Sequence, residues 1–415
     1  MDTPGRRLTI ALLHLDLGFG GAERLMLDAA LELGALGHRT ALFTSAMNPA
    51  RTFDDATNGR VDVRVRVSRL PAAIARRVRV PCAVVRMAGL AAAARRELAP
   101  DLVLCDLVPQ AIAAVRRLAR APVLFYCHYP DALLAPPGGV AYRLYRWGLD
   151  AMERQGMRCA DGLATNSQFT RRAMGLQMPR LAIDAVPVVY PGVDLMRFGQ
   201  LPPVPEAWSD GDEVVVASVG RFHPDKDHPL AVSAFAALLR QVPDTLRRRL
   251  RLVISGGLDA TRPEEQQVRT ALAERIRFYG LDAQVALCLS PTDAAQRELM
   301  ARASLVLHTA PAEHFGMSPV EAMAAGRPVV AVARGGLLET IRDGETGFLR
   351  EPTAEALAEA LATACAEPSM VVRMGRQARV DAQVRFSRQR FGQQLHESAL
   401  AAFDRGATGH RPYGV

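Results

Sequence analysis

The stretch EHFGMSPVE at residues 313–321, which follows the apolar run SLVLHT at residues 304–309, decides how the second half of the chain folds. The apolar run predicts a strand, and the segment Pro319–Ala325 predicts a helix directly after the loop. Glu313 and Glu321 therefore fall at the carboxyl end of a strand, the edge at which parallel α/β sheets bind their ligands. In isolation, two glutamates with this spacing are more often a polar loop before an ordinary helix.

Two other loops follow predicted strands in the same way and give the glutamate pair a context. The segment GRFHPDKD at residues 220–227 comes directly after the run Val214–Val219, and GFGGAER at residues 18–24 comes shortly after the run Leu8–Leu13. The first of these loops carries two cations, and the second is rich in glycine. Together with the glutamates, they predict a site for a negatively charged ligand that is rich in hydroxyl groups.

Both halves of the chain repeat a plan of strand, loop and helix. A helix is expected over Ala22–Gly34, and a linker rich in proline and polar residues over Leu201–Asp212. Strands are expected at residues 8–13, 39–44, 102–105, 123–127, 162–164, 214–219, 252–255, 285–289, 305–308 and 329–332. Since helix-like runs separate them, the predicted fold class is α/β, with two Rossmann-like, doubly wound domains of parallel strands that face a cleft.

The domain boundaries follow from this pattern. We expect an N-terminal domain over residues 1–200, a C-terminal domain over residues 201–385, and a final helix and tail over residues 386–415 that pack back on the N-terminal domain. Beyond Asp404 the tail is rich in glycine and arginine and is predicted to fray.

Composition predicts a globular protein without a membrane span. Of the 415 residues, 49% are hydrophobic, and charge interrupts the long apolar stretches, as Asp106 interrupts Leu98–Val115. The first strand-like run is short and ends in His14, so no secretory signal is predicted and a cytoplasmic location is expected. The cysteines lack C-x-x-C spacing and are interpreted as reduced residues, at positions 82, 105, 127, 159, 288 and 365.

Positive charge is distributed unevenly along the chain. The 51 Lys and Arg exceed the 43 Asp and Glu by 8, and ten arginines fall between Arg60 and Arg96, with Asp62 as the one acidic residue among them. No aromatic interleaving, zinc pattern or recognition helix accompanies this basic block, so nucleic acid is not the expected partner. An anionic membrane surface fits the block better, since it attracts basic segments by roughly 1 kcal/mol per residue. A solvated, arginine-rich face is the equally simple alternative.

The loop after the first strand of the second half carries Arg221 and Lys226. An arginine fork and a lysine point charge suit a diphosphate, whose negative charge grows as a bond to it breaks. Asp225 and Asp227 also form a D-x-D pattern, which holds a divalent metal in other transferases. The lysine between them already supplies positive charge, and Asp227 is expected to cap a helix that starts near Pro229, so a metal-independent site is predicted.

The glycine-rich loop has two interpretations. Gly18, Gly20 and Gly21 either let backbone N–H groups approach a ligand at a helix N-terminus or form only a tight turn. The loop lacks the dinucleotide fingerprint G-x-G-x-x-G, because Glu23 stands three positions after Gly20. A nicotinamide cofactor, and with it a dehydrogenase, is therefore not expected.

A single histidine, His128, follows the run Val123–Cys127. A lone histidine at a strand end is more often structural, but the carboxyl edge of a parallel sheet is also where ligands bind. The next loop, Ala132–Ala141, contains no charge and is expected to meet a lipid or to bury against the other domain.

Taken in order, these motifs resemble the retaining GT-B glycosyltransferases of family 4. The resemblance covers nearly the whole chain and rests on GGAER (20–24), the His128 loop, Asn166 and Ser167 with Phe169, YPGVD (190–194), GRF (220–222), Lys226, the stretch 313–321 and GRPVV (326–330). It implies acceptor binding by the N-terminal domain and nucleotide-sugar binding by the C-terminal domain. It also implies front-face attack, in which the leaving diphosphate takes the acceptor's proton and charge stabilisation is the main catalytic contribution.

The resemblance implies a role for each candidate residue. Arg221 and Lys226 would grip the donor diphosphate, Glu313 the sugar hydroxyls and Glu321 the ribose. The implied catalytic residues are His128, Arg221, Lys226 and Glu313. The implied donor-binding residues are Gly20, Gly21, Arg221, Lys226, Glu313, His314, Phe315, Gly316, Met317, Ser318 and Glu321. The implied acceptor-binding residues are Tyr129, Asp131, Leu133 and Leu134.

Within the family, three segments resemble the mannosyltransferases that extend a dolichol-linked oligosaccharide: YCHYPD (126–131), the pair Leu133–Leu134 and YRLYRW (142–147). This implies GDP-mannose as donor, a mannosylated polyprenyl-pyrophosphate glycan as acceptor, and α-1,3 and α-1,6 linkages. Peripheral association with the cytoplasmic face of a membrane would give access to such an acceptor.

Other functions fit the same architecture. A related transferase would use another nucleotide sugar and a polysaccharide or lipopolysaccharide acceptor. A nucleotide-sugar 2-epimerase would release a free epimerised sugar without any acceptor. A non-catalytic sensor would bind the donor without turnover, although the intact set of Arg221, Lys226, Glu313 and Glu321 argues against it.

Overall fold

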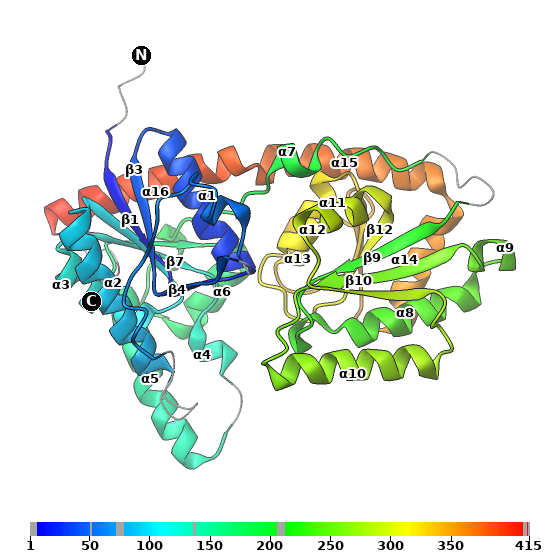
Figure 1. Ribbon diagram of the computed structural model, residues 1–415, viewed down its shortest axis with the longest axis horizontal. Coiled ribbons are helices and arrows are strands. Elements are labelled where there is room, and N and C mark those ends of the chain that lie inside the picture. The colour runs from blue at the N-terminus through cyan, green and yellow to red at the C-terminus, as the bar shows by residue number, and fades with distance from the viewer. Residues whose placement is uncertain are drawn as a thin grey trace. The chain divides into compact units, whose positions relative to one another are not determined.

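The chain folds into two units, drawn in Figure 1, and the computed structural model describes residues 6–49, 52–71, 79–135, 138–205, 212–409 and 413. Unit 1 consists of Met1–Gly192 and Arg388–Val415, and unit 2 of Val193–Ser387. The chain thus divides after residues 192 and 387, beside expected boundaries after residues 200 and 385. Parts of the expected linker, basic block and apolar loop lie outside the described residues, at 206–211, 72–78 and 136–137.

Unit 1 is built on a six-stranded parallel sheet in the order β5-β3-β1-β6-β7-β8. Its strands are β1 (Thr9–Leu13), β3 (Arg39–Thr44), β5 (Val63–Val65), β6 (Leu102–Asp106), β7 (Val123–Cys127) and β8 (Gly162–Thr165). A separate two-stranded ladder joins β2 (Asp16–Leu17) to β4 (Ala46–Met47). The five strands predicted in this half are confirmed. Strand β5 was not expected, because it lies inside the arginine-rich block.

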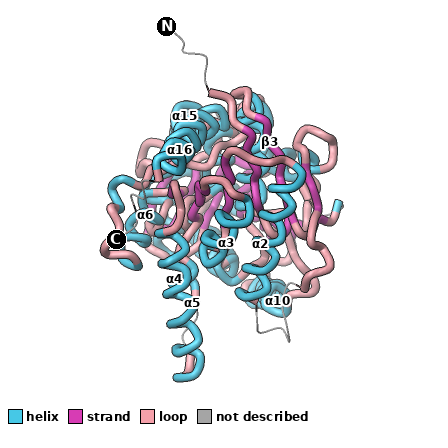
Figure 2. The backbone as a smooth tube through the Cα atoms, turned by 90° about the vertical axis from the view of Figure 1, so that its left-hand side faces the viewer, coloured by secondary structure: helices cyan, strands magenta, loops and turns pink. Residues whose placement is uncertain are grey.

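Helices cover both faces of this sheet, since alternate residues of a strand point to opposite faces. Ile10 and Leu12 pack with α1 (Gly21–Ala35) and α16 (Arg388–Thr408), whereas Ala11 and Leu13 pack with α2 (Val80–Glu97) and α3 (Ile112–Ala119). The remaining helices are α4 (Asp131–Leu134), α5 (Val140–Arg158), α6 (Gln168–Gln177) and the 3-10 turns Asp54–Ala56, Pro109–Ala111 and Ile183–Ala185. In Figure 2, one end of α5 extends beyond the other helices of unit 1.

The prediction that the tail frays beyond Asp404 is wrong for the residues described there, 405–409 and 413. Helix α16 continues to Thr408, and Arg405 Nε donates a 2.7 Å hydrogen bond to the carbonyl of Asp161 at the start of β8. Further along, Tyr413 is buried, and its hydroxyl lies 3.4 Å from the backbone nitrogen of Leu163. Packing against the sheet therefore holds a segment whose composition favours disorder.

Unit 2 repeats the architecture with a sheet in the order β11-β10-β9-β12-β13-β14, again parallel throughout. Its strands are β9 (Val214–Val219), β10 (Leu250–Gly256), β11 (Val285–Leu289), β12 (Ala303–His308), β13 (Val329–Val332) and β14 (Gly347–Arg350). The five predicted strands are confirmed. Strand β14 was not expected, because it is short, begins with glycine and ends in arginine.

The core of unit 2 contains alternate residues of β9, such as Val214 and Val216, packed against α8 and α14 through Phe235 and Leu357. The helices are α7 (Leu195–Phe198), α8 (His228–Gln241), α9 (Asp244–Arg247), α10 (Pro263–Phe278), α11 (Asp293–Arg302), α12 (Met317–Ala324), α13 (Leu337–Thr340), α14 (Ala354–Ala366) and α15 (Pro368–Phe386), with a 3-10 turn at Pro224–Lys226. Across the described residues of both units, no helix has the length and hydropathy that a membrane crossing requires.

Both sheets place their first strand between the second and the fourth strand in chain order. The order of the strands therefore reverses between β1 and β6 in unit 1 and between β9 and β12 in unit 2. Ligands of doubly wound sheets bind outside the carboxyl ends of the strands at this point. The residues that follow these four strands are consequently the first place to look for a site in each unit.

Candidate active site

In unit 2, the loops after β9 and β12 bring three polar side chains together. Lys226 Nζ lies 2.5 Å from Glu313 Oε2, and His308 Nε2 lies 3.0 Å from the same oxygen. The carboxylate accepts from both groups, so a single oxygen holds an ammonium and an imidazole. The side chains of Lys226 and Glu313 are 23% and 15% exposed, which leaves the pair accessible from solvent.

Electrostatics keep this carboxylate ionised. Burial alone would raise the pKa of Glu313, but Lys226 and His308 hold it well below its usual range. Burial lowers the pKa of His308 in turn, and its Nε2–H is the proton that faces Glu313. The cluster therefore contains one anion and one cation at neutral pH, with a neutral imidazole beneath them.

The loop that carries Lys226 is fixed by hydrogen bonds on both sides. Burial lowers the pKa of His228 to about 4, and its neutral ring donates from Nε2 to the carbonyls of Gly220 and Arg221. Thr309 donates to the carbonyl of Lys226 at 2.9 Å. The predicted cap is confirmed, because the Asp227 carboxylate accepts from the Leu230 N–H at the start of α8. Asp227 itself adopts a left-handed conformation with φ of 44°.

The loop that carries Glu313 is packed against a second, glycine-containing loop. The Gly336 N–H donates to the carbonyl of Glu313 at 2.8 Å. A Cβ on Gly335 would lie 2.2 Å from that carbonyl oxygen, and φ at Gly335 is +64°, so only glycine fits without a shift. On the other side, the ring of Phe315 is buried and meets Phe386 edge to face at 5.5 Å.

The other predicted donor residues of unit 2 surround this pair. His314, Phe315 and Gly316 continue the loop after Glu313, and Gly316 is the N-cap of α12 with φ of +98°. Met317 and Ser318 form the first turn of that helix, and Glu321 lies on it, partly exposed. Arg221 is exposed at the end of β9 and has no ion-pair partner among the described residues. The structure thus joins Lys226 to Glu313 directly and leaves Arg221 open to solvent.

Lys226 has a further distinction. It is the only lysine of the chain, because every other cation among the 51 Lys and Arg is an arginine. A lysine presents a compact charge on a flexible stem, whereas an arginine presents a planar fork. Its isolation in an arginine-rich chain indicates that this position requires the compact ammonium.

In unit 1, the strand ends at the reversal point form a second buried cluster. Asp106, the last residue of β6, accepts from His14 Nδ1 at 2.9 and 3.0 Å and from His128 Nε2 at 2.9 Å. The side chains of His14 and Asp106 are 1% and 0% exposed, while that of His128 is 20% exposed. The series of hydrogen bonds from His14 through Asp106 to His128 therefore runs from the interior toward the surface.

The charges of this cluster are set by mutual contact. Burial disfavours a charged His14 ring, yet Asp106, with Glu23 and Asp16 farther away, raises the pKa of His14 to about 9. Burial would also raise the pKa of Asp106, but His14 and His128 hold it below its usual range. His14 is thus an imidazolium at neutral pH, bonded to an ionised Asp106.

Sequence reasoning identified His128 but missed His14 and Asp106, as well as His308 and Thr309 in unit 2. A signal for them exists. Each is a polar residue that immediately follows, or ends, an apolar run predicted as a strand, and such runs end at the ligand-binding edge of a parallel sheet.

The glycine-rich loop precedes α1 as predicted. Gly20 is the N-cap in an extended conformation, and Gly21 opens the helix. Arg24, one turn later, bonds Asp28 and Asp55, and the Asp55–Arg24 distance is 2.8 Å. This ion cluster anchors the first turn of α1, so that the loop has a rigid base.

The predicted acceptor residues lie together after β7. Tyr129 stacks on Phe169 with ring centroids 5.8 Å apart, and Asp131 starts the short helix α4, on which Leu133 and Leu134 are 38% and 56% exposed. The charge-free loop Ala132–Ala141 is thus partly helical in its described residues, with α4 at one end and the start of α5 at the other.

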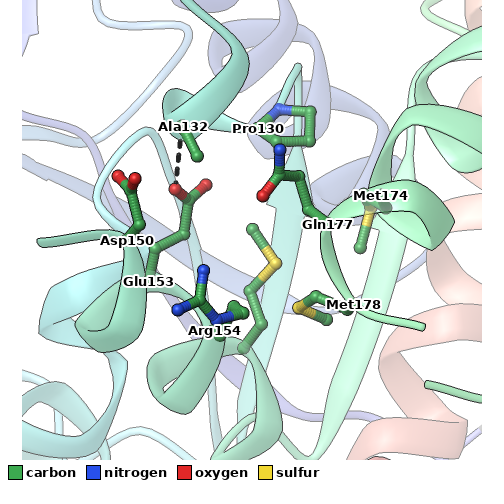
Figure 3. A pocket seen from close by; sticks show the side chains of 9 residues that line it. Pro130, Ala132, Asp150, Glu153, Arg154, Met174, Gln177 and Met178 are labelled. Carbon is green, nitrogen blue, oxygen red and sulfur yellow. Dashed lines mark hydrogen bonds between the residues drawn. The ribbon is translucent and has the colours of Figure 1, made fainter. Parts of the chain in front are cut away.

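A buried carboxylate orients α4. Glu153 on α5 accepts from the backbone N–H groups of Asp131 and Ala132 at 2.8 and 2.9 Å, and Figure 3 shows it directed at Ala132, with Met174 and Met178 across the pocket. Burial raises the pKa of Glu153 to about 7. The start of α4 is therefore held by one carboxylate of α5.

Within the described ranges, no group of three or more His, Cys, Asp and Glu side chains is placed to hold a metal ion. The carboxylates of the D-x-D pattern have different partners, since Asp227 caps α8 and Asp225 lies 3.0 Å from His223.

Comparison with known folds and families agrees with this arrangement. The structure resembles Anabaena HepE in complex with UDP and glucose, with a TM-score of 0.72 and 22% identity over 94% of this chain and 98% of that one. It also resembles WaaG, a glycosyltransferase involved in lipopolysaccharide biosynthesis, with a TM-score of 0.70 and 19% identity over 94% and 99% of the two chains. Both likenesses show the GT-B fold.

Sequence comparison is more specific. The model "Glycosyltransferase Family 4" matches residues 19–197, and "Glycosyl transferases group 1" matches residues 205–381. The alpha-1,3/1,6-mannosyltransferase ALG2 of Homo sapiens is 34% identical over 400 residues, which cover 94% of each chain. That of Dictyostelium discoideum is 31% identical over 410 residues, covering 94% of this chain and 97% of that one. The chain is therefore a GT-B glycosyltransferase of family 4 and belongs to the alpha-1,3/1,6-mannosyltransferases.

Proposed function

We propose that the protein transfers mannose from GDP-mannose to a lipid-linked, mannosylated oligosaccharide, forming α-1,3 linkages, α-1,6 linkages or both. The observation that carries the proposal is the cluster of Lys226, Glu313 and His308 at the reversal point of the unit 2 sheet. The choice of mannose is supported by the similarity to the alpha-1,3/1,6-mannosyltransferases of Homo sapiens and Dictyostelium discoideum.

Lys226 and Arg221 would hold the donor diphosphate. As the bond to the sugar breaks, negative charge grows on the diphosphate, and a preorganised cation stabilises it most at that moment. Lys226 is already fixed by Glu313 and by the backbone bond from Thr309, so little reorganisation is needed. The exposed Arg221 is free of ion pairs within the described residues and is available for the same group. This charge stabilisation does not require a metal ion.

Glu313 would bind the sugar hydroxyls, and Glu321 the ribose. A carboxylate whose pKa is held low is an acceptor for hydroxyl groups at every physiological pH. The N–H groups of the first turn of α12, near Met317 and Ser318, would face an anion, because a helix N-terminus favours negative charge. Among the residues of unit 1, His128 would contact the transferred sugar, and the loop at Gly20 and Gly21 would bind the donor phosphates.

The acceptor's lipid would bring the protein to an anionic membrane surface, with α5 as the contact. Val140, Leu144 and Trp147 are 74%, 71% and 69% exposed and recur at intervals of four and three residues, so they share one face of the helix. Arg143, beside them, is also exposed. An apolar stripe with a flanking cation is typical of helices that lie in the membrane interface. This arrangement suits peripheral attachment at the cytoplasmic face.

The basic block at residues 60–96 offers fewer free cations for membrane binding than its composition suggests. Asp and Glu side chains pair with four of its ten arginines, namely Arg60, Arg64, Arg66 and Arg86. Arg76 and Arg77 lie outside the described residues. Arg95 and Arg96 are exposed at the end of α2 and remain available to an anionic surface. We therefore assign the membrane contact to α5 first.

The decisive experiment measures nucleotide release from GDP-mannose, UDP-glucose and UDP-N-acetylglucosamine, each with and without a short polyprenyl-pyrophosphate trisaccharide that ends in β-mannose. We expect GDP release only with this acceptor, and a product heavier by one or two hexoses. Release from a UDP-sugar would favour the alternative with a polysaccharide or lipopolysaccharide acceptor. Free epimerised sugar without acceptor would identify an epimerase, and no release from any donor would identify a sensor.

The membrane contact is tested separately by flotation with phosphatidylcholine vesicles that contain or lack phosphatidylglycerol. The double variant Leu144→Asp, Trp147→Ala should lose binding to the anionic vesicles. The matched control is Leu176→Asp, which changes an 81% exposed leucine on α6 and should bind like the wild type. Equal binding by all three proteins would contradict the assignment to α5.

A further inference from the structure

In the cluster of His14, Asp106 and His128, the hydrogen bonds of both histidine rings run to the same carboxylate. Neither His14 nor Asp106 has a role in the proposed function. The Asp106 carboxylate can only accept hydrogen bonds while ionised, so both rings must donate to it. His14 therefore donates from Nδ1 and His128 donates from Nε2. This fixes the tautomer of His128, and its Nδ1 is the ring nitrogen that remains for a ligand.

We propose that Asp106 and His14 are positioning residues for sugar transfer: Asp106 holds the His128 ring by its Nε2–H so that Nδ1 faces the sugar, and His14 holds Asp106 in place and supplies the compensating charge. The proposal rests on the proposed function, in which His128 contacts the transferred mannose. His14 and Asp106 thus act on the reaction through His128 and not through direct contact with the donor.

Burial supports the assignment to positioning rather than contact. His14 and Asp106 are almost fully buried, and of the three side chains His128 alone reaches solvent. Among the described residues, His14 Nε2 has no hydrogen-bond partner, so Asp106 alone orients that ring. The Tyr126 ring lies 5.2 Å from the His128 ring and limits its rotation from the side.

The backbone around Asp106 is consistent with a fixed carboxylate. Leu107, the next residue, adopts a left-handed conformation with φ of 59°, which is costly for leucine. This turn ends β6 at Asp106. The carboxylate is thus held by the strand on one side and by two imidazoles on the other.

The first test reads the tautomers directly, without activity. In protein labelled with 15N-histidine, long-range 15N–1H spectra distinguish the two neutral tautomers and the imidazolium, and the variants His14→Asn and His128→Ala assign the two rings. At neutral pH we expect an Nε2–H tautomer for His128 and a doubly protonated ring for His14. An Nδ1–H tautomer for His128 would overturn the proposal.

The second test compares turnover of GDP-mannose with the trisaccharide acceptor. Asp106→Asn should lower kcat about a hundredfold and change the KM for GDP-mannose less than about threefold, because a misplaced contact to the transferred sugar costs turnover more than binding. His14→Asn, which keeps a donor near the position of Nδ1 without the charge, should lose less. The matched control Asp101→Asn alters a carboxylate at the opposite end of the same strand, where it bonds the Thr9 N–H, and should behave as wild type.

A double variant separates positioning from general support of the fold. In the background of His128→Ala, Asp106→Asn should cause no further loss, since its effect acts through His128. Full activity of Asp106→Asn, or the same fractional loss in both backgrounds, would overturn the inference while leaving mannosyl transfer intact. Full activity of His128→Ala would overturn it as well. The proposed function fails separately, if the wild type itself transfers no mannose.

Discussion

The two sheets hold a carboxylate at the same topological point but expose it differently. In unit 1, Asp106 ends the fourth strand and is fully buried between two histidines. In unit 2, Glu313 lies on the loop five residues beyond its strand, between Lys226 and His308, and its side chain is 15% exposed. A carboxylate on a loop can meet a ligand directly. A carboxylate at the end of a strand acts through the residue in front of it.

The partners differ in a second respect. In unit 1 the pKa of His14 is raised to about 9 by Asp106, whereas in unit 2 the pKa of Glu313 is held below its usual range by Lys226 and His308. The unit 2 cluster is therefore sensitive to acid through its carboxylate, and the unit 1 cluster is sensitive to base through its imidazolium. Four predictions test this comparison.

The largest expected effect is on activity in unit 2. Lys226→Ala should lower kcat/KM for mannose transfer by about a thousandfold or more, since it removes the cation that we propose stabilises the leaving diphosphate. The thermal unfolding temperature should change little, because Glu313 retains His308 as a partner. The control Arg302→Ala removes a 60% exposed cation of the same unit and should leave kcat/KM unchanged. An active Lys226→Ala variant would contradict the proposed role of Lys226 in donor binding.

The next effect is on the stability of unit 1 in base. The folded pKa of His14 is raised from 6.5 to about 9, so its stabilising charge is fully present below pH 6.5 and is lost as the pH rises through 9. Wild type should be more stable than His14→Asn near pH 6, by on the order of 3 kcal/mol. Thermal unfolding between pH 6 and pH 10 should show this advantage shrinking toward the basic end. A constant difference would show that the charge of His14 does not matter for stability.

The corresponding effect in unit 2 has the opposite sign. The folded pKa of Glu313 is lowered from 4.5, so its contribution is present above pH 4.5 and is lost as the pH falls further. The advantage of wild type over Glu313→Gln in thermal unfolding should be constant near neutral pH and shrink in acid. Its size should be on the order of 2 kcal/mol, because the pair still contacts solvent. If the advantage of wild type shrank in base instead, the predicted ionisation of Glu313 would be contradicted.

The smallest effect concerns the D-x-D pattern beside Lys226. Asp225→Asn should change kcat less than about twofold, and a chelator should have no effect, if Lys226 rather than a metal supplies the positive charge. Measured rates of mannose transfer with and without chelator check both statements. A large loss of activity in either case would show that the loop with Asp225 and Lys226 binds a metal ion.

Much of the fold was predictable because its strands are continuous apolar runs. Buried parallel strands read as such runs, and the ten predicted strands are present. The two missed strands of the sheets, β5 and β14, are short and flanked by charge, so their pairing depends on the neighbouring strand rather than on their own residues. The length of α16 was underestimated for a related reason, since its last turn is held by contacts with β8.

The site was predictable where it lies on loops with a characteristic pattern, as at Lys226 and Glu313. It was not predictable where single residues from distant strands converge. His14 and Asp106 are 92 positions apart in the chain, and only the neighbouring positions of β1 and β6 in the sheet bring them within 2.9 Å. Likewise, the requirement for glycine at Gly335 arises from contact with the Glu313 carbonyl.

The solitary lysine makes this protein unusually simple to label. Amine-selective reagents have two targets, the α-amino group and the Lys226 side chain, which is 23% exposed. Reductive methylation with isotopically labelled formaldehyde would therefore place one side-chain reporter in the candidate donor site of an otherwise unaltered protein. Protection of that amine by a nucleotide sugar would measure occupancy without turnover, acceptor or mutation.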